Sequence, residues 1–219
     1  MVEDPEMIDE VMKDAIRIAT HGRPGPVWID IPMDVQGAEC FSIEDAVKRA
    51  KRPLILAGNG INCAQAREEF KFFVDLTNIP VVTSYNGVDL ISSDDRNFVG
   101  RVGVKGTRAG NFAMQNCDLL LVIGCRLPVP VTGYNYKTFA REAEVIVVDI
   151  DRDEHSKDTV KIDRFINRDA KNFLDLYWFD RRKSDWNYLC EEWKEKWPVC
   201  PTENLSLIHI SEPTRQAEI

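Results

Sequence analysis

The chain has 219 residues, 44% of them hydrophobic, and a formal net charge of −8 at pH 7. This is enough for one sizeable core with further pieces attached, and the acidic balance is ordinary for a soluble cytoplasmic protein. No block of Lys and Arg stands out, which argues against nucleic-acid binding, and no apolar run approaches the length of a membrane span.

The six cysteines are scattered without a CxxC pair, and the three histidines lie apart from them. We therefore expect no metal site in the chain, zinc in particular. Most of the cysteines lie in or beside apolar runs, which is typical of reduced thiols in a reducing compartment. The first ten residues are acidic and have no apolar segment, so they do not resemble a signal peptide.

Residues 1–40 predict one helix followed by one strand. Asp4 and Pro5 are typical of a helix start, and apolar residues recur at helical spacing as far as Ala19. The run VWIDI at 27–31 predicts a buried strand, and a linker follows. Because such a unit cannot bury its own apolar faces, we expect it to be the last piece of a preceding domain.

From about residue 42 the pattern becomes a regular alternation of strands and helices. Short apolar runs predict strands at 53–57, 79–83, 118–124 and 144–151. Helical patterns are found at 64–77, 107–115, 136–141 and 170–177. Near-continuous apolar strands that alternate with helices indicate an α/β domain with a doubly wound parallel sheet, covered on both faces and ending near residue 178.

A further helix with three tryptophans follows this domain. Trp186, Trp193 and Trp197 fall on one helical face and require a large surface to pack on. No partner element follows in the sequence, so we expect this face to be exposed. The same holds for the predicted helix 5–20 and strand 27–31, and exposed apolar area of that kind promotes association.

Ligands of doubly wound sheets bind beyond the carboxyl ends of the strands, so the residues after each strand are the candidates. Gly58 and Gly60 follow the first strand and let the backbone approach a phosphate. The dinucleotide fingerprint nevertheless fails, because Cys63 occupies its third glycine position and Thr83 stands where an acid closes the second strand. A tight strand-to-helix turn is the alternative.

The segment GRVGVKGTRAG, residues 100–110, carries four glycines before a predicted helix. Its free amides, together with Lys105 and Arg108, predict a diphosphate cradle. The alternative is a glycine-rich loop with solvated charges.

Two more strand exits carry charged residues. Arg126 follows the third strand and can hold a phosphate in fork geometry, or be a surface arginine. Asp149 and Asp151 end the fourth and can accept from ribose hydroxyls, or cap a helix. Together these placements predict a nucleotide-binding surface, and nothing marks a catalytic pair of residues.

The motifs resemble the acetolactate synthase large subunit and its relatives among the thiamin-diphosphate-dependent carboligases and decarboxylases. GRPGPVWIDIPMDVQ at 22–36 is similar to the signature that closes the first domain of the family. RPLILAGNGI at 52–61 is similar to the start of its middle domain, and GVKGTRAGNFAMQNCDLLLVIGCR at 103–126 matches a middle-domain motif. VTG at 131–133 and VVDID at 147–151 follow in register.

The resemblance implies three domains, of which the middle one is a Rossmann-like sheet of six parallel strands. It implies FAD in that domain, without a redox part in the main reaction. The FAD contacts carried over by position are Gly58, Gly60, Thr83, Gly103, Lys105, Gly106, Gly124, Arg126, Asp149 and Asp151.

This sequence departs from the family pattern at two places. Lys105 replaces a histidine, and residues 127–130 replace an acidic pair. The sequence therefore leaves open whether the middle domain holds FAD, ADP or no nucleotide.

The family's catalytic Glu and its GDG…N motif, which holds Mg²⁺ and thiamin diphosphate, have no counterpart here. We therefore expect 1–40 to close the pyrimidine-binding domain, 41–178 to be the nucleotide-binding domain, and 179–204 to begin the diphosphate-binding domain. The tail LSLIHISEPTRQAEI, 205–219, is similar to a translated sequencing adapter and is expected to be non-native. The chain by itself is expected to be an inactive fragment with no catalytic residue.

The resemblance implies a parent transferase of branched-chain amino acid biosynthesis that joins two 2-keto acids and decarboxylates one of them. It implies a cytoplasmic homodimer or homotetramer, with or without a regulatory subunit. One alternative keeps the superfamily but changes the substrate to another 2-keto acid or an acyl-CoA. Another is a free-standing nucleotide-binding module of deacetylase type, which the cysteine spacing argues against.

Overall fold

A computed structural model describes residues 1–2, 5–38, 42–177 and 184–199 of the chain. The predicted tail at 205–219 lies outside these residues. Among the described helices, none is both long enough and apolar enough to cross a membrane.

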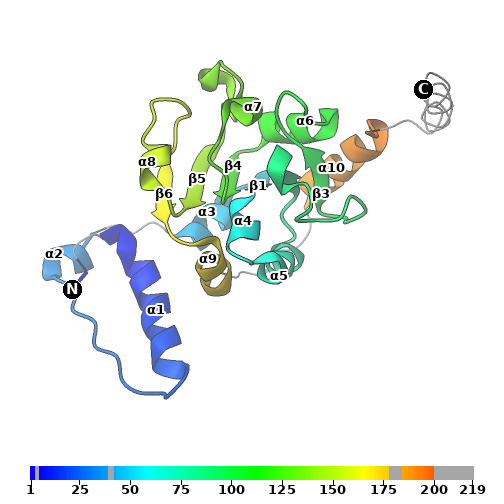
Figure 1. The fold of residues 1–219 in the computed structure, drawn as a ribbon. Coiled ribbons are helices and arrows are strands. Elements are labelled where there is room, and N and C mark those ends of the chain that lie inside the picture. Colours follow the sequence, from blue (N-terminus) through cyan, green and yellow to red (C-terminus); the bar gives the residue numbers. More distant parts are fainter. Residues whose placement is uncertain (3–4, 39–41, 178–183, 200–219) are drawn as a thin grey trace, which may run out of the picture.

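The core of the protein is a six-stranded sheet in which every pair of neighbours is parallel (Figure 1). In sheet order the strands are β3 (Phe98–Arg101), β2 (Val81–Thr83), β1 (Pro53–Ala57), β4 (Leu119–Ile123), β5 (Glu144–Asp149) and β6 (Arg164–Asn167). The chain thus starts in the middle at β1, proceeds to one edge, returns to β4 beside β1 and proceeds to the other edge. The predicted doubly wound α/β sheet is confirmed, and β1/β4 is its switch point.

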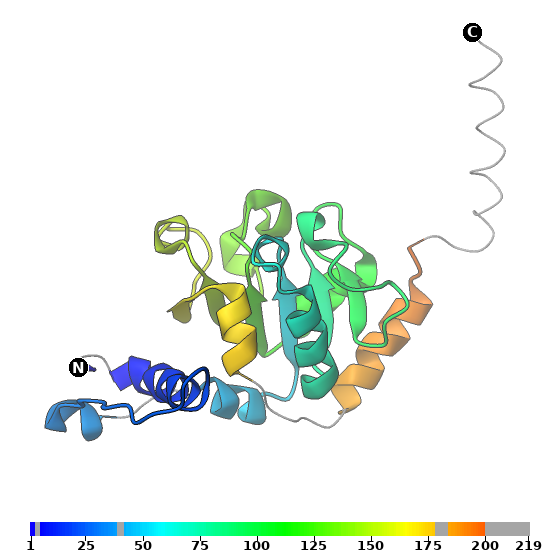
Figure 2. The same cartoon turned by 60° about the horizontal axis from the view of Figure 1, so that its bottom comes forward.

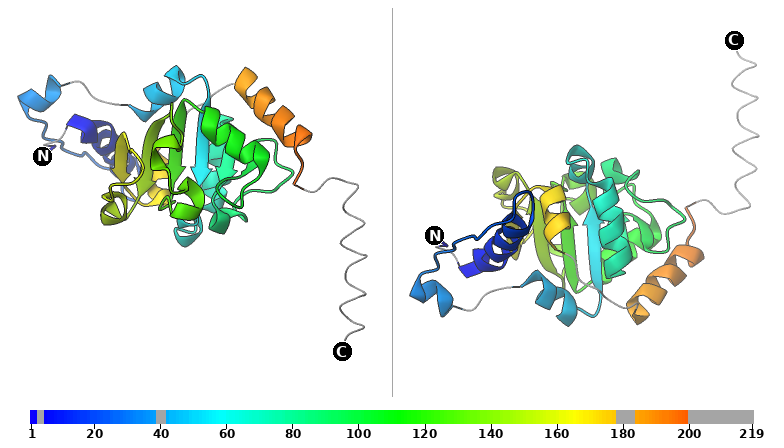
Figure 3. Two further views of the ribbon diagram at one scale, coloured as in Figure 1. Left: turned by 90° about the horizontal axis from the view of Figure 1, so that it is seen from above. Right: turned by 90° about the horizontal axis from the view of Figure 1, so that it is seen from below.

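Helices cover both faces of the sheet (Figures 2 and 3). One face packs on α3 (Ile43–Arg49), α5 (Arg67–Thr77) and α9 (Ala170–Leu176). The other packs on α6 (Arg108–Asn116) and α10 (Asp185–Lys196). All residues of β1 and β4 are buried, as expected for central strands of a doubly covered parallel sheet.

The remaining helical segments are short, apart from the N-terminal helix. They are η1 (Pro5–Met7), α1 (Ile8–Thr20), α2 (Met33–Gln36), α4 (Gly60–Cys63), η2 (Tyr85–Gly87), α7 (Val129–Thr132), η3 (Tyr136–Thr138) and α8 (Arg152–His155). The prediction of a helix at 136–141 is wrong, because a single 3₁₀ turn is found there.

Local sequence signals set several helix ends. The Thr107 hydroxyl accepts from the Gly110 amide and begins α6. Asp169 begins α9 in the same way by accepting from the amides of Lys171 and Asn172. Asn78 ends α5 in the left-handed conformation, at a φ of 49°.

The predicted strand at 27–31 is wrong. These residues are neither helical nor paired in a sheet, and Trp28 is 93% exposed. The preceding helix is confirmed as α1, which lies beside α9 and β6 (Figure 1) and carries exposed Ile16 and Ile18, as predicted.

The predicted exposure of the tryptophan face is also wrong. Trp186 is 4% exposed, and its indole N–H donates to the Pro53 carbonyl at 3.0 Å. Helix α10 packs on α6 and β3, where Phe112 lies 5.8 Å from Trp193 and 4.9 Å from Trp197 between ring centroids. The apolar side of α6 is therefore the partner that the sequence pattern did not reveal.

Candidate functional site

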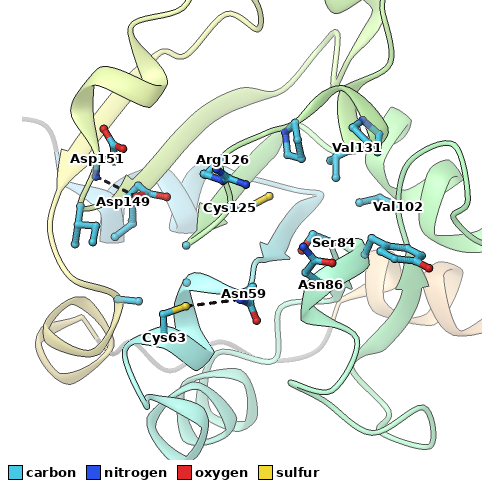
Figure 4. Close-up of a pocket in the computed structure, with 18 of the residues that line it drawn as sticks. Asn59, Cys63, Ser84, Asn86, Val102, Cys125, Arg126, Val131, Asp149 and Asp151 are labelled. Carbon is cyan, nitrogen blue, oxygen red and sulfur yellow. Dashed lines mark hydrogen bonds between the residues drawn. The ribbon is translucent and has the colours of Figure 1, made fainter.

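A cavity of about 990 Å³ lies beyond the carboxyl ends of the strands (Figure 4). Residues after all six strands line it, from Lys105 after β3 to Arg168 after β6. Its volume is at the upper end of the range of small-molecule sites. Of the ten residues predicted by position, Gly60, Lys105, Gly124, Arg126, Asp149 and Asp151 line this cavity.

The floor of the cavity is the contact between the exits of β1 and β4. The Gly58 amide donates to the Ile123 carbonyl at 2.9 Å, and the Gly60 amide donates to the Gly124 carbonyl at 2.8 Å. A Cβ on Gly58 would lie 2.1 Å from the Gly124 carbonyl oxygen. These glycines therefore allow two strand exits to touch, and their amides are not free for a phosphate.

The glycine-rich loop is closed by internal hydrogen bonds in the same way. The Gly103 amide donates to the Asn111 side chain at 2.9 Å, and the Gly106 amide donates to the Gly103 carbonyl at 2.9 Å. The prediction that this loop offers these amides as an anion cradle is therefore wrong. Of the two cations predicted for the cradle, Lys105 lines the cavity, whereas Arg108 lies over the Trp197 ring, 5.6 Å from its centroid.

Thr83, another residue predicted by position, ends β2 below the cavity. Its side chain is fully buried, and its hydroxyl has no hydrogen-bond partner among the described residues. Its carbonyl accepts from the Val102 amide at 3.0 Å. Thr83, Gly58, Gly103 and Gly106 therefore support the walls of the cavity and do not line it.

Positive charge in the cavity comes from side chains. Lys105 and Arg126 are exposed and lie on opposite sides of the β1/β2 exits, and Arg168 lies at the β6 edge. Arg168 is paired with Asp14, so Lys105 and Arg126 are the exposed cations that can attract a phosphate.

The two predicted carboxylates differ in what they do. The Asp151 carboxylate accepts from the Glu154 amide at 3.0 Å and begins α8, so the alternative of a helix cap is confirmed for it. Asp149 accepts from the Asp151 amide at 3.1 Å and lies 3.4 Å from the imidazole Nε2 of His155. Burial alone would raise the pKa of Asp149, but the imidazole and the backbone N–H groups outweigh burial and lower the pKa. Asp149 is thus a carboxylate held at the end of β5.

The sheet consists of two similar halves, β1–β2–β3 and β4–β5–β6, which meet at the switch point. In the second half a glycine turn at Gly124 follows the first strand, and the acid Asp149 ends the second strand. That is the arrangement with which Rossmann halves hold a ribose. In the first half the corresponding strand ends in Thr83, so this half lacks the acid of the dinucleotide fingerprint.

Several polar and aromatic residues of the site were missed from the sequence. Asn59, Ser84, Tyr85, Asn86, Cys63 and Tyr134 line the cavity. Asn86 follows β2 just as Arg126 follows β4, so the rule that selects strand exits could have found it. Tyr134 follows α7, and no strand-exit rule reaches it.

The described residues contain no group of three or more His, Cys, Asp or Glu side chains that could hold a metal ion. The cavity combines exposed cations, Lys105 and Arg126, with the Asp149 carboxylate.

Comparison with known proteins gives the family of this domain. Residues 42–176 match the family model described as thiamine pyrophosphate enzyme, central domain. The chain is 38% identical over 200 residues to the probable acetolactate synthase large subunit of Methanocaldococcus jannaschii, covering 79% of this chain and 34% of that protein. It is 33% identical over 177 residues to the acetolactate synthase isozyme 2 large subunit of Escherichia coli, covering 72% and 32%.

A third relative is the acetolactate synthase large subunit of Corynebacterium glutamicum, 36% identical over 181 residues, covering 72% of this chain and 29% of that protein. The chain spans about a third of the length of these curated relatives.

Proposed function

We propose, because this chain belongs to the thiamine pyrophosphate enzyme family through its central domain, that the whole protein is a thiamin-diphosphate-dependent carboligase of acetolactate synthase type. Such an enzyme decarboxylates one 2-keto acid and joins the remainder to a second, which gives a 2-hydroxy-2-methyl-3-keto acid. Thiamin diphosphate supplies the nucleophilic carbon for this chemistry. The agreement of the family match with the names of three relatives supports the proposal.

The part of the protein described here has a supporting role in that proposal. Its residues form no cluster of ligands for Mg²⁺, so we assign thiamin diphosphate and its metal to other parts of the whole protein. We assign residues 41–178 to the middle domain and 1–40 to the preceding one, with assembly into homodimers or homotetramers and a regulatory subunit as further expectations.

We assign the cavity to an adenine nucleotide, and FAD is the candidate that fits its extent. The observation that carries this assignment is the position of the cavity across the β1/β4 switch point, from Lys105 after β3 to Asp149 after β5. A dinucleotide extends to both sides of a switch point, with its pyrophosphate near the centre. In this placement Asp149 accepts from a ribose, and Arg126 and Lys105 attract the phosphates.

ADP is the second candidate, supported by the two departures from the family pattern. Lys105 replaces the family's histidine, and the apolar residues 127–130 replace its acidic pair. With ADP in the cavity, the whole protein would fall in the branch that acts on acyl-CoA substrates.

Equilibrium binding of FAD and of ADP to the purified chain, followed by calorimetry, tests the site. We expect Arg126→Gln and Lys105→Gln each to weaken binding about tenfold, because each removes a charge-assisted contact to phosphate. Lys137→Gln is the matched control, since Lys137 is exposed and does not line the cavity. Failure of both nucleotides to bind, or equal affinities for Arg126→Gln and Lys137→Gln, would refute the assignment.

The activity needs the whole protein. We expect it to form acetolactate from pyruvate with thiamin diphosphate and Mg²⁺, and turnover of another 2-keto acid or of an acyl-CoA alone would refute the acetolactate assignment.

A further inference from the structure

His155 is a buried polar residue beside the cavity whose position the proposed function does not use. Its side chain exposes 3% of its surface, and its Nε2 has no hydrogen-bond partner among the described residues. A buried polar atom without a partner costs free energy, so its retention calls for a reason. The carboxylate of Asp149 lies 3.4 Å from this nitrogen, so a small approach of the two side chains would form a charge-assisted hydrogen bond.

The surroundings of His155 fix where its ring lies. It is the last residue of α8, and the Asp151 carboxylate holds the start of that helix through the Glu154 amide. On one side the ring lies against Phe165, with 5.3 Å between ring centroids. The imidazole therefore has little freedom, and Asp149 is the partner toward which its Nε2 lies.

Besides Asp149, the charged groups near the His155 ring line a second, smaller cavity. A chamber of about 130 Å³ is lined by His155 together with Arg126, Glu154 and Lys157. The Lys157 ammonium is hydrogen-bonded to the Glu154 carboxylate, so these two charges are paired with each other. Arg126 lines both cavities. Among the groups around His155, the Asp149 carboxylate is the one that an imidazole N–H can hold in place.

We propose that His155 is a positioning residue for Asp149 and thereby sets a preference for ribonucleotides over 2′-deoxyribonucleotides. The Asp149 carboxylate already accepts from the Asp151 amide. A second hydrogen bond, from His155, fixes its remaining lone pairs toward the cavity, where they accept from ribose hydroxyls. This inference rests on the proposed nucleotide site and adds the device that reads the sugar.

Two substitutions separate positioning from packing. His155→Gln keeps an N–H donor near the position of Nε2, whereas His155→Leu fills the space without a donor. A packing role predicts that both nucleotides lose affinity together, or that only stability changes. A positioning role predicts that the ratio of the two affinities changes.

The probes are ADP and 2′-deoxy-ADP, titrated calorimetrically into the full chain. We expect the unsubstituted protein to bind ADP at least about tenfold more tightly, because a site built for a hydroxyl rejects the analogue that lacks it. We expect His155→Gln to keep this ratio and His155→Leu to reduce it to near one, mainly through weaker binding of ADP. Asp149→Asn should lower the ratio in the same way, and circular dichroism reports whether each variant is folded.

The outcomes are distinguishable. If the unsubstituted protein binds neither nucleotide, the proposed nucleotide site and this inference both fall. If it binds both equally, or if folded His155→Leu keeps the full ratio, His155 does not position a sugar-reading carboxylate and the nucleotide site stands. Should His155→Leu fail to fold, His155→Met removes the donor with an unbranched chain, and a retained ratio there overturns the inference equally.

Discussion

The Arg168 guanidinium makes two hydrogen bonds to the Asp14 carboxylate, at 3.4 and 3.0 Å, between residues 154 positions apart in the sequence. Arg168 follows β6 and lines the cavity, whereas Asp14 belongs to α1. The pair therefore joins the N-terminal helix to the rim of the candidate nucleotide site.

Asp14→Asn should destabilise the protein by about 1 kcal/mol, or roughly 2–4 °C in Tm, because the pair is only partly buried. Burial would raise the pKa of Asp14, but Arg168, together with Arg17, outweighs burial and lowers the pKa. A lowered pKa in the folded state means that the stabilisation is fully present above about pH 5 and is lost as the pH falls through the folded pKa.

Urea unfolding of both proteins between pH 3 and 7 measures this effect. The difference between them should be constant above about pH 5 and shrink below pH 4. Asp34→Asn is the control, because Asp34 is an exposed acid on the same N-terminal segment with no ion pair among the described residues. A difference that grows on acidification would contradict the role of the ion pair.

The central strands were predictable from the sequence because their environment is uniform. All residues of β1 and β4 are buried, and an apolar run is the direct record of burial on both faces. The edge strands β3 and β6 were missed, since FVGR and RFIN are half-buried and mix charged with apolar residues. The run VWIDI at 27–31 is the opposite case, because a strand was predicted where none is found. An apolar sequence forms a strand only where a neighbouring strand is present to pair with it.

The candidate site was predictable in its place and less so in its chemistry. Parallel strands bring all their carboxyl ends to one edge, so Arg126 and Asp149 could be brought together from the sequence. Which acceptor a backbone amide finds depends on contacts across the sheet. The Gly60 amide donates to the carbonyl of Gly124, which lies far along the chain, and no local sequence pattern reveals this.

Trp186→Phe should destabilise the protein by about 2–3 kcal/mol. It removes the hydrogen bond to the Pro53 carbonyl and leaves a gap beside Trp193, whose ring meets that of Trp186 edge to face at 5.7 Å. Trp28→Phe is the matched control, because Trp28 is 93% exposed and should change stability by less than about 0.5 kcal/mol. Urea denaturation followed by far-ultraviolet circular dichroism measures both, and equal effects would show that α10 is not packed as described.

Gly58→Ala should destabilise the protein by about 2 kcal/mol or more and weaken nucleotide binding. The new methyl group would meet the Gly124 carbonyl oxygen at 2.1 Å, and separating two strand exits distorts the floor of the cavity. Gly25→Ala makes the same change where no atom lies within 4 Å and should be nearly neutral. Thermal unfolding compares the two, and a Tm for Gly58→Ala as high as that of Gly25→Ala would mean that the exits do not touch.

Among the four described cysteines, Cys63 should react first with iodoacetamide, and a nucleotide in the cavity should slow that reaction. Cys63 is exposed and lines the cavity. Burial raises the pKa of Cys125 to about 11 and that of Cys117 to about 12, and it also raises the pKa of Cys190. The thiolate is the form of cysteine that reacts. Because those three thiols are protonated and shielded near pH 8, they should react slowly.

Peptide mass spectrometry after timed alkylation, with and without saturating FAD or ADP, measures the rate at each cysteine. Raising the pH from 7 to 9 should leave Cys125 unlabelled, because a pKa of about 11 keeps its thiolate scarce. Cys63→Ser controls for the assignment of the modified peptide. Labelling of Cys125 ahead of Cys63 would mean that the floor of the cavity opens to solvent, which is incompatible with the packed contact between the β1 and β4 exits.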